Sequence, residues 1–154
     1  MKIAIANDHA GYDLKMTLLP FLTKNGYEVL DLGAQTAEIP SDYPDYAVVV
    51  AEAIKSGKAE RGVLVCGSGV GVSVAANKVP GIRAAMCHDT FSARQGVEDD
   101  SMNVLCLGGR VIGPELATEV IKSYLAAEFS GLERHERRLN KVKKIEADAL
   151  AGKL

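Results

Sequence analysis

The chain has 154 residues, 47% hydrophobic and 25% charged, which is ordinary for a globular protein long enough to bury a core. Its net charge of −2 gives no electrostatic reason to expect binding to nucleic acid or to an anionic membrane. The opening "MKIAIANDHAG" is a poor secretion signal, and no apolar run approaches the roughly 20 residues that cross a bilayer, so we expect a cytoplasmic protein.

Short apolar runs alternate with helical patterns along the chain. The expected strands cover residues 2–6, 27–33, 61–67, 82–87 and 103–109. The expected helices cover residues 12–25, 46–55, 70–78, 90–98 and 114–127, followed by a charged helix at about 132–149. Several strands are apolar almost throughout, which is typical of a sheet covered on both faces. This order predicts an α/β fold, a single three-layer α/β/α Rossmann-like domain over residues 1–154 with a five-stranded parallel sheet and an extra C-terminal helix.

Polar side chains follow several of these strands. Asp8 and His9 come after the first strand, and Arg110 comes after the fifth. The third strand ends at Cys66 and Ser68. Because parallel strands present their carboxyl ends at one edge of a sheet, we expect these groups to share a cleft. Asp8 followed by a surface histidine is, by itself, explained equally well by a helix N-cap.

The segment "CGSGVG", residues 66–71, ends the third strand and opens a helix. Backbone N–H groups at such a junction point at any anion or partly negative oxygen placed there, and the helix dipole assists them. The G-x-G-x-G spacing has neither the Walker lysine nor the dinucleotide pattern, so we do not expect ATP or NAD. The structural alternative is that these glycines only permit a tight turn.

Cys66 stands at the entrance to this loop, where N–H dipoles favour a thiolate over a thiol. It is therefore a candidate nucleophile or general base. The role of base needs only a substrate C–H and donors for the developing oxyanion, and Ser68 and the loop amides are candidates for those donors. Cys87 and Cys106 lie in apolar runs without CxxC or metal-ligand spacing, so we expect small buried hydrophobes and no metal site.

Two charged clusters remain. Arg134 and Arg138 are four residues apart in the last helix, on one face, where they are suited to clamping a phosphate. The alternative is a solvated basic face, balanced by neighbouring glutamates. Asp99 and Asp100 precede the fifth strand; such a pair more often caps a helix end or faces water than binds a metal.

Five segments together resemble the type B ribose-5-phosphate isomerase family, which includes galactose- and allose-6-phosphate isomerases. They are "NDHAGYDLK", "SDYPDYA", "CGSGVGVSVAANKVPGIRAA", "MNVLCLGGRVIG" and "RHERR". The resemblance covers nearly the whole chain, and the order Cys, Gly, hydroxyl, Gly, apolar residue, Gly and then "AANK" is specific. It implies aldose–ketose isomerisation of a phosphorylated sugar through an enediolate, without metal or organic cofactor. It also implies a homodimer or tetramer whose active sites are shared between subunits.

The resemblance also implies roles for individual residues. Cys66 would move the proton between C1 and C2, and Ser68 with loop 67–71 would hold the enediolate oxygens. Arg110, Arg134 and Arg138 match positions associated with phosphate binding, the last two after allowing for one extra residue. The full set of expected substrate-binding residues is Asp8, His9, Asp42, Tyr43, Gly67, Gly69, Val70, Gly71, Asp100, Arg110, Arg134 and Arg138.

One position departs from the family pattern. Many members have a histidine where this chain has Asp99 and an asparagine where it has Asp100, and that histidine is assigned to opening the furanose ring. Asp99 can serve as this catalytic acid only where burial or neighbouring carboxylates keep it protonated; otherwise His9 or His88 would serve. Tetrose phosphates cannot close such a ring, so a substrate such as erythrulose 4-phosphate needs no such acid.

The resemblance makes ribose 5-phosphate and ribulose 5-phosphate the leading substrate pair. A tetrose phosphate and a hexose 6-phosphate are the alternatives within the same reaction. A non-catalytic sugar-phosphate binding module is the alternative from another class, although it would need no thiol at Cys66. A thiol redox protein is disfavoured because no resolving cysteine is near in the sequence.

Overall fold

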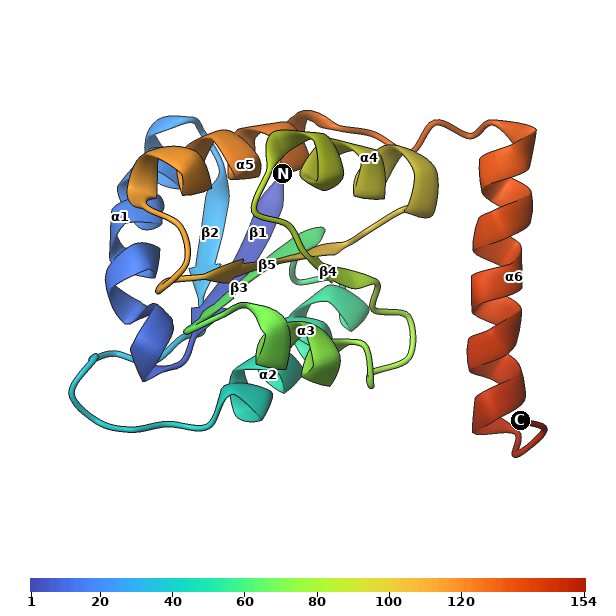
Figure 1. Ribbon diagram of the computed structural model, residues 1–154, viewed down its shortest axis with the longest axis horizontal. Coiled ribbons are helices and arrows are strands. Elements are labelled where there is room, and N and C mark those ends of the chain that lie inside the picture. Colours follow the sequence, from blue (N-terminus) through green and yellow to red (C-terminus); the bar gives the residue numbers. More distant parts are fainter.

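The computed structural model describes residues 1–154 and contains five strands alternating with helices (Figure 1). The strands are β1 (Lys2–Asn7), β2 (Glu28–Asp31), β3 (Arg61–Cys66), β4 (Ala84–Met86) and β5 (Val104–Gly108). The helices are α1 (Tyr12–Lys24), α2 (Tyr43–Lys55), α3 (Val70–Ala76), α4 (Thr90–Asp100), α5 (Pro114–Ala126) and α6 (Glu133–Leu150), with a 3-10 turn, η1 (His9–Gly11). All strands pair in parallel, in the order β2-β1-β3-β5-β4, which confirms the predicted α/β fold.

Alternate residues of the central strands face opposite helical layers. Ile3 and Val63 belong to the larger apolar cluster, which α1, α4 and α5 complete. Ala4 and Leu64, one position along, belong to the second cluster with α2 and α3. Figure 1 shows these two helical layers on either side of the sheet. Because both faces are covered, the central strands β1, β3 and β5 are apolar almost throughout rather than alternating, as the sequence predicts.

The element boundaries differ from the sequence prediction at a few places. Helix α2 begins at Tyr43, three residues before the predicted start, because Pro44 occupies its first turn, where a missing N–H costs nothing. Strand β2 is shorter than predicted and mostly exposed, since it lies at an edge of the sheet. The predicted stop at Gly26 is confirmed by its φ of +80°, which a residue without Cβ adopts freely.

The strand order places a cleft at one edge of the sheet. In the sheet, β2 lies on one side of β1, and β3, β5 and β4 lie on the other, so the connections that leave β1 and β3 go in opposite directions. Ligands of open parallel sheets bind where such loops separate. The loops after β1, β3 and β5 meet here, at the carboxyl edge.

Helix α6 stands at the opposite, amino edge of the sheet, beyond the end of α4 (Figure 1). Only His135 and Leu139 of its 18 residues are buried. A groove of about 530 Å³ lies between α6 and the body of the domain. The residues of α6 that line it include Val142 and Ile145. No helix of the chain is both long enough and apolar enough to span a bilayer.

Candidate active site at the carboxyl edge

Cys66 is the last residue of β3, and its side chain is 96% shielded from solvent. The Gly69 N–H donates to its sulfur, with 3.1 Å between nitrogen and Sγ. Gly69 reaches this position with φ of +82°, and a Cβ there would lie 2.9 Å from the Leu107 carbonyl carbon. A side chain is therefore excluded at Gly69 by both conformation and space. The loop wraps the sulfur in backbone rather than in side chains.

The backbone N–H groups of this loop divide into two sets. The Gly69 N–H is used by Cys66, and the Val70 N–H donates to Ser68 Oγ (3.2 Å). The N–H groups of Gly67, Ser68 and Gly71 have no hydrogen-bond partner within the chain. Since Ser68 Oγ accepts from Val70, the serine keeps its own O–H to donate. The donors left for a bound oxygen are therefore these three amides and one hydroxyl.

Asp8 caps the turn that follows β1. Its Oδ1 accepts from the N–H groups of Ala10 (2.9 Å) and Gly11 (3.0 Å), and the residue is 6% exposed. Asp8 is therefore an N-cap residue, which is the structural alternative that the sequence left open. Gly11 packs against β3 so closely that a Cβ would lie 2.2 Å from the Val65 carbonyl oxygen. The cap holds η1 directly against the strand that carries Cys66.

His9 connects this turn to the long segment before α2. The Ser41 N–H donates to His9 Nδ1 (3.1 Å), and the His9 N–H donates to Ser41 Oγ (3.0 Å). Nδ1 also lies 3.3 Å from the Ser41 carbonyl oxygen, but the nearer Ser41 N–H can only donate, so Nδ1 accepts and the ring proton is on Nε2. Ser41 is not predicted from the sequence, because a bond between residues 32 positions apart leaves no local pattern.

Two side chains from distant parts of the sequence, Tyr43 and Arg110, pack against the glycine loop. A Cβ at Gly71 would lie 3.0 Å from the Tyr43 ring, so this glycine allows the ring to pack on the loop. The Arg110 guanidinium lies beside Gly67, 3.5 Å from the position of a Cβ there, and no carboxylate pairs with it. Asp42 precedes Tyr43 as the N-cap residue of α2 and makes no side-chain bond there.

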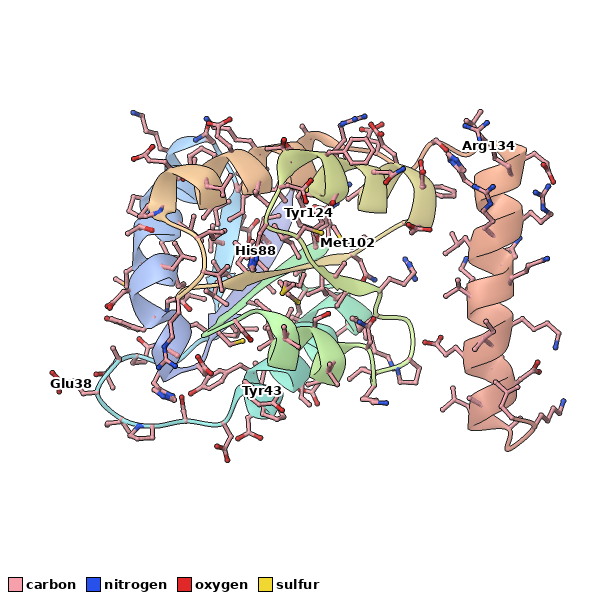
Figure 2. All side chains as sticks on the ribbon, viewed as in Figure 1. Glu38, Tyr43, His88, Met102, Tyr124 and Arg134 are labelled. Atoms are coloured by element: carbon pink, nitrogen blue, oxygen red, sulfur yellow. The ribbon has the colours of Figure 1, made fainter.

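Four of the expected residues lie far from Cys66 in the same chain. Asp99 and Asp100 end α4, at the amino edge, and Arg134 and Arg138 lie on α6. Figure 2 shows Arg134 on α6, apart from Tyr43 and the body of the domain. The Asp99 carboxylate instead faces His135, with 3.4 Å between Oδ1 and Nδ1. One chain thus assembles only part of the expected set.

The other two cysteines are buried hydrophobes, as predicted. Cys87 and Cys106 are 4% and 0% exposed. Burial raises the pKa of the Cys87 thiol to about 11, assisted by the negative charge of Asp89. Burial raises the pKa of Cys106 further, and the neighbouring Cys66 adds to this effect. No group of three or more His, Cys, Asp or Glu side chains is arranged to hold a metal ion.

Comparison with known proteins finds close relatives over nearly the whole chain. The family model described as ribose/galactose isomerase matches residues 3–142. The chain is 50% identical to the D-erythrulose-4-phosphate isomerase of Pectobacterium atrosepticum over 132 residues, which cover 85% of this chain and 86% of the relative. It superimposes on the ribose-5-phosphate isomerase B of Clostridium thermocellum with a TM-score of 0.93, 49% identity, and coverage of 97% and 99%.

A further solved structure carries a ligand. It is the ribose-5-phosphate isomerase B of Mycoplasma genitalium with bound ribulose 5-phosphate. Its TM-score to this chain is 0.89, with 37% identity and coverage of 96% of this chain and 97% of that one. Similarity at this level extends through every strand of the sheet and the loops at its carboxyl edge.

Proposed function

We propose that this chain, which belongs to the ribose/galactose isomerase family and is a sugar-phosphate aldose–ketose isomerase, interconverts ribose 5-phosphate and ribulose 5-phosphate with Cys66 as the base. The observation that carries the proposal is a thiol enclosed by a loop whose amides at Gly67, Ser68 and Gly71 have no partner in the chain. A sulfur beside unused donors is suited to moving a proton while the adjacent oxygen gains charge.

The proposed reaction is a proton transfer between two neighbouring carbons. The Cys66 thiolate takes the proton from C2 of the aldose, and the C1 carbonyl oxygen becomes an enediolate oxygen. The free amides and the Ser68 hydroxyl hold this oxygen. The C2 hydroxyl proton passes to the C1 oxygen, and the thiol then delivers its proton to C1 as the C2 oxygen becomes the ketone, so no external oxidant or reductant enters. In this scheme Asp8, through its second oxygen, and His9, through Nε2, contact the sugar.

The proposed active site is completed by a second copy of the chain. Asp99 and Asp100 end α4 and Arg134 and Arg138 lie on α6, at the amino edge of the sheet, whereas Cys66 lies at the carboxyl edge. Helix α6 also leaves Val142 and Ile145 half or more exposed, next to a groove. Apolar side chains on a projecting helix are typical of a surface that another subunit covers. We therefore propose a homodimer or tetramer, with the whole of residues 1–154 as one isomerase unit in the cytoplasm.

A tetrose 4-phosphate is the second candidate substrate. A linear tetrose phosphate needs no acid for ring opening, and Asp99 replaces the histidine that the resemblance associates with that step. The relative that is 50% identical is named as a D-erythrulose-4-phosphate isomerase. Within the chain, the Asp99 carboxylate lies next to the imidazole of His135.

The test is a panel of ribose 5-phosphate, erythrose 4-phosphate and allose 6-phosphate, followed by NMR in D₂O. We expect deuterium at C2 of the aldose and a highest kcat/KM for ribose 5-phosphate. A higher kcat/KM for the tetrose would replace the first substrate by the second. An Asp99→His variant then measures the ring-opening requirement, because it should raise turnover of the five-carbon sugar and leave the tetrose unchanged. Binding of all three sugars without exchange would contradict the catalytic proposal.

A further inference from the structure

His88 is a half-buried histidine that hydrogen-bonds to the strand beside Cys66. It follows β4 directly, and the Gly108 N–H donates to its Nε2, with 2.9 Å between the two nitrogens. The ladder between β4 and β5 ends at Met86 and Cys106. The imidazole thus supplies the acceptor that continued backbone pairing would have given to Gly108. In Figure 2, His88 lies over the sheet and apart from Arg134.

Gly108 supports the loop that carries the catalytic thiol. It is the register partner of Cys66, and a Cβ at Gly108 would lie 2.6 Å from the Ser68 carbonyl oxygen. The next two N–H groups, of Gly109 and Arg110, donate to the carbonyls of residues 66 and 67 at 2.8 and 3.0 Å. The end of β5 is therefore the surface on which loop 67–71 rests, and His88 holds that end in place.

The hydrogen bond defines the protonation state of the ring. Only a neutral imidazole with its proton on Nδ1 accepts at Nε2. Burial lowers the pKa of His88 below the ordinary 6.5, and the adjacent Asp89 carboxylate opposes this shift. At this end of the sheet Met86 and Val111 are uncharged, Arg110 beside Gly67 is cationic, and Cys66, Asp8 and His9 are the other titratable groups; none of them hydrogen-bonds to the His88 ring. Because the folded pKa lies below 6.5, the bond is fully present above that pH and is lost as the pH falls through the folded value.

We infer that His88 is a positioning residue of the proposed isomerase site, which as a neutral acceptor fixes the end of β5 and so the backbone around Cys66. Protonation removes the acceptor and turns an N–H toward the Gly108 N–H, so the anchor opens in acid. The inference rests on the proposed function only for the reaction that Cys66 carries out. The bond itself can be tested without any substrate.

The first experiment measures the tautomer of His88 by ¹⁵N NMR of the wild-type protein at pH 7.5. We expect a protonated Nδ1 and an unprotonated Nε2, together with slow hydrogen exchange at the Gly108 amide. Free histidine prefers the opposite tautomer, so this signature reports the contact directly. A ring protonated at Nε2 would overturn the inference, whatever the outcome of any activity assay.

The second experiment compares His88→Leu with His88→Gln. Glutamine offers a carbonyl oxygen at a similar reach and does not titrate, whereas leucine offers no acceptor. We expect His88→Leu to lower kcat for ribose 5-phosphate by about 10- to 100-fold with little change in KM, because a displaced catalytic group costs rate rather than binding. His88→Gln should retain most of the turnover and lack the additional loss that the wild type shows below pH 6.5.

Equal activities of the two variants, or a folded His88→Leu protein with wild-type kcat, would overturn the inference. Should no sugar phosphate be turned over by the wild type, the rate of Cys66 alkylation by iodoacetamide replaces kcat as the readout. A change in that rate in the leucine variant alone supports the anchor, and an unchanged rate contradicts it. Failure of the proposed function and failure of the anchor therefore give different results.

Discussion

The two edges of the sheet differ in how completely one chain builds them. At the carboxyl edge, Cys66, Asp8 and His9 are each held by backbone hydrogen bonds from neighbouring loops. At the amino edge, α6 projects from the body and buries only two of its residues. Yet the arginines expected to bind phosphate, Arg134 and Arg138, are on α6.

This difference separates two requirements of the proposed reaction. Proton transfer needs groups fixed to a fraction of an ångström, and a chain secures that by enclosing the thiol in its own backbone. Phosphate binding needs positively charged side chains that remain exposed to water until a ligand or a second subunit contacts them. The proposal assigns the first requirement to a single folded chain and the second to an assembly of two or more chains.

The largest effect is expected at the thiol. Cys66→Ala should lower the exchange of the aldose C2 proton by about 10³-fold, because the base is removed while the loop remains. Cys87→Ala, which removes a buried thiol that lies outside the loop, is the matched control and should stay close to wild type. Proton exchange is measured by ¹H NMR in D₂O. Exchange that survives in Cys66→Ala would assign the base to another residue.

The reactivity of the three thiols should differ by a smaller factor. The pKa of Cys87, raised from the ordinary 9.0 to about 11, leaves about 100-fold less thiolate at neutral pH. Brief treatment with iodoacetamide at pH 8, followed by peptide mass mapping, should therefore label Cys66 before Cys87. Because the neutral thiol is favoured in the fold, the free energy of unfolding should also fall as the pH rises from about 9 to 11. Equal labelling would show that the raised pKa of Cys87 does not limit its reaction.

The arginines of α6 should affect binding more than chemistry. Arg138→Ala is expected to raise KM by about 10- to 100-fold, the cost of losing charged hydrogen bonds to a phosphate. Arg137→Ala is the matched control, because Arg137 is already paired with Glu133 at 2.8 Å. Steady-state kinetics with ribose 5-phosphate distinguishes the two.

A mixing experiment tests whether the two edges meet between subunits. Cys66→Ala and Arg138→Ala proteins, unfolded together and refolded, should regain about a quarter of wild-type turnover at subsaturating substrate, because half of the dimers have one intact site. Refolding each variant alone gives the baseline. Activity no higher than the sum of the activities of the two variants would place Cys66 and Arg138 in an active site made by one chain. That result would contradict their positions at opposite edges of the sheet.

The smallest effects concern stability. Leu18→Ala, in the fully buried core, should cost about 3 kcal/mol of unfolding free energy. Val142→Ala, which is 50% exposed on α6, should cost within about 0.5 kcal/mol at low protein concentration. Denaturant titrations at two concentrations measure both. A loss for Val142→Ala that appears only at high concentration would sharpen the comparison, since it would show that another copy covers α6.

Local patterns were sufficient for much of the fold. The alternation of apolar runs and helical segments predicts all five strands and six helices, because burial on both faces and helix stop signals such as Gly26 are properties of short segments. The loop around Cys66 was equally visible, since Cys, Gly and Ser stand together in the chain. The earlier start of α2 is not predicted, because the segment "SDYPDYA", which contains Pro44 and carries part of the family resemblance, also forms the first helical turn.

The rest of the candidate site depends on contacts between distant residues. Ser41 bonds to His9 across 32 positions, and His88 bonds to Gly108 across 20. Such pairs follow from strand order and loop paths, which no local pattern encodes. Local patterns in the chain are thus enough to predict the fold class and the thiol with its glycine loop. Packing across the whole sheet, by contrast, sets which amides stay free, which histidine bonds to Gly108, and the position of the α6 arginines at the opposite edge.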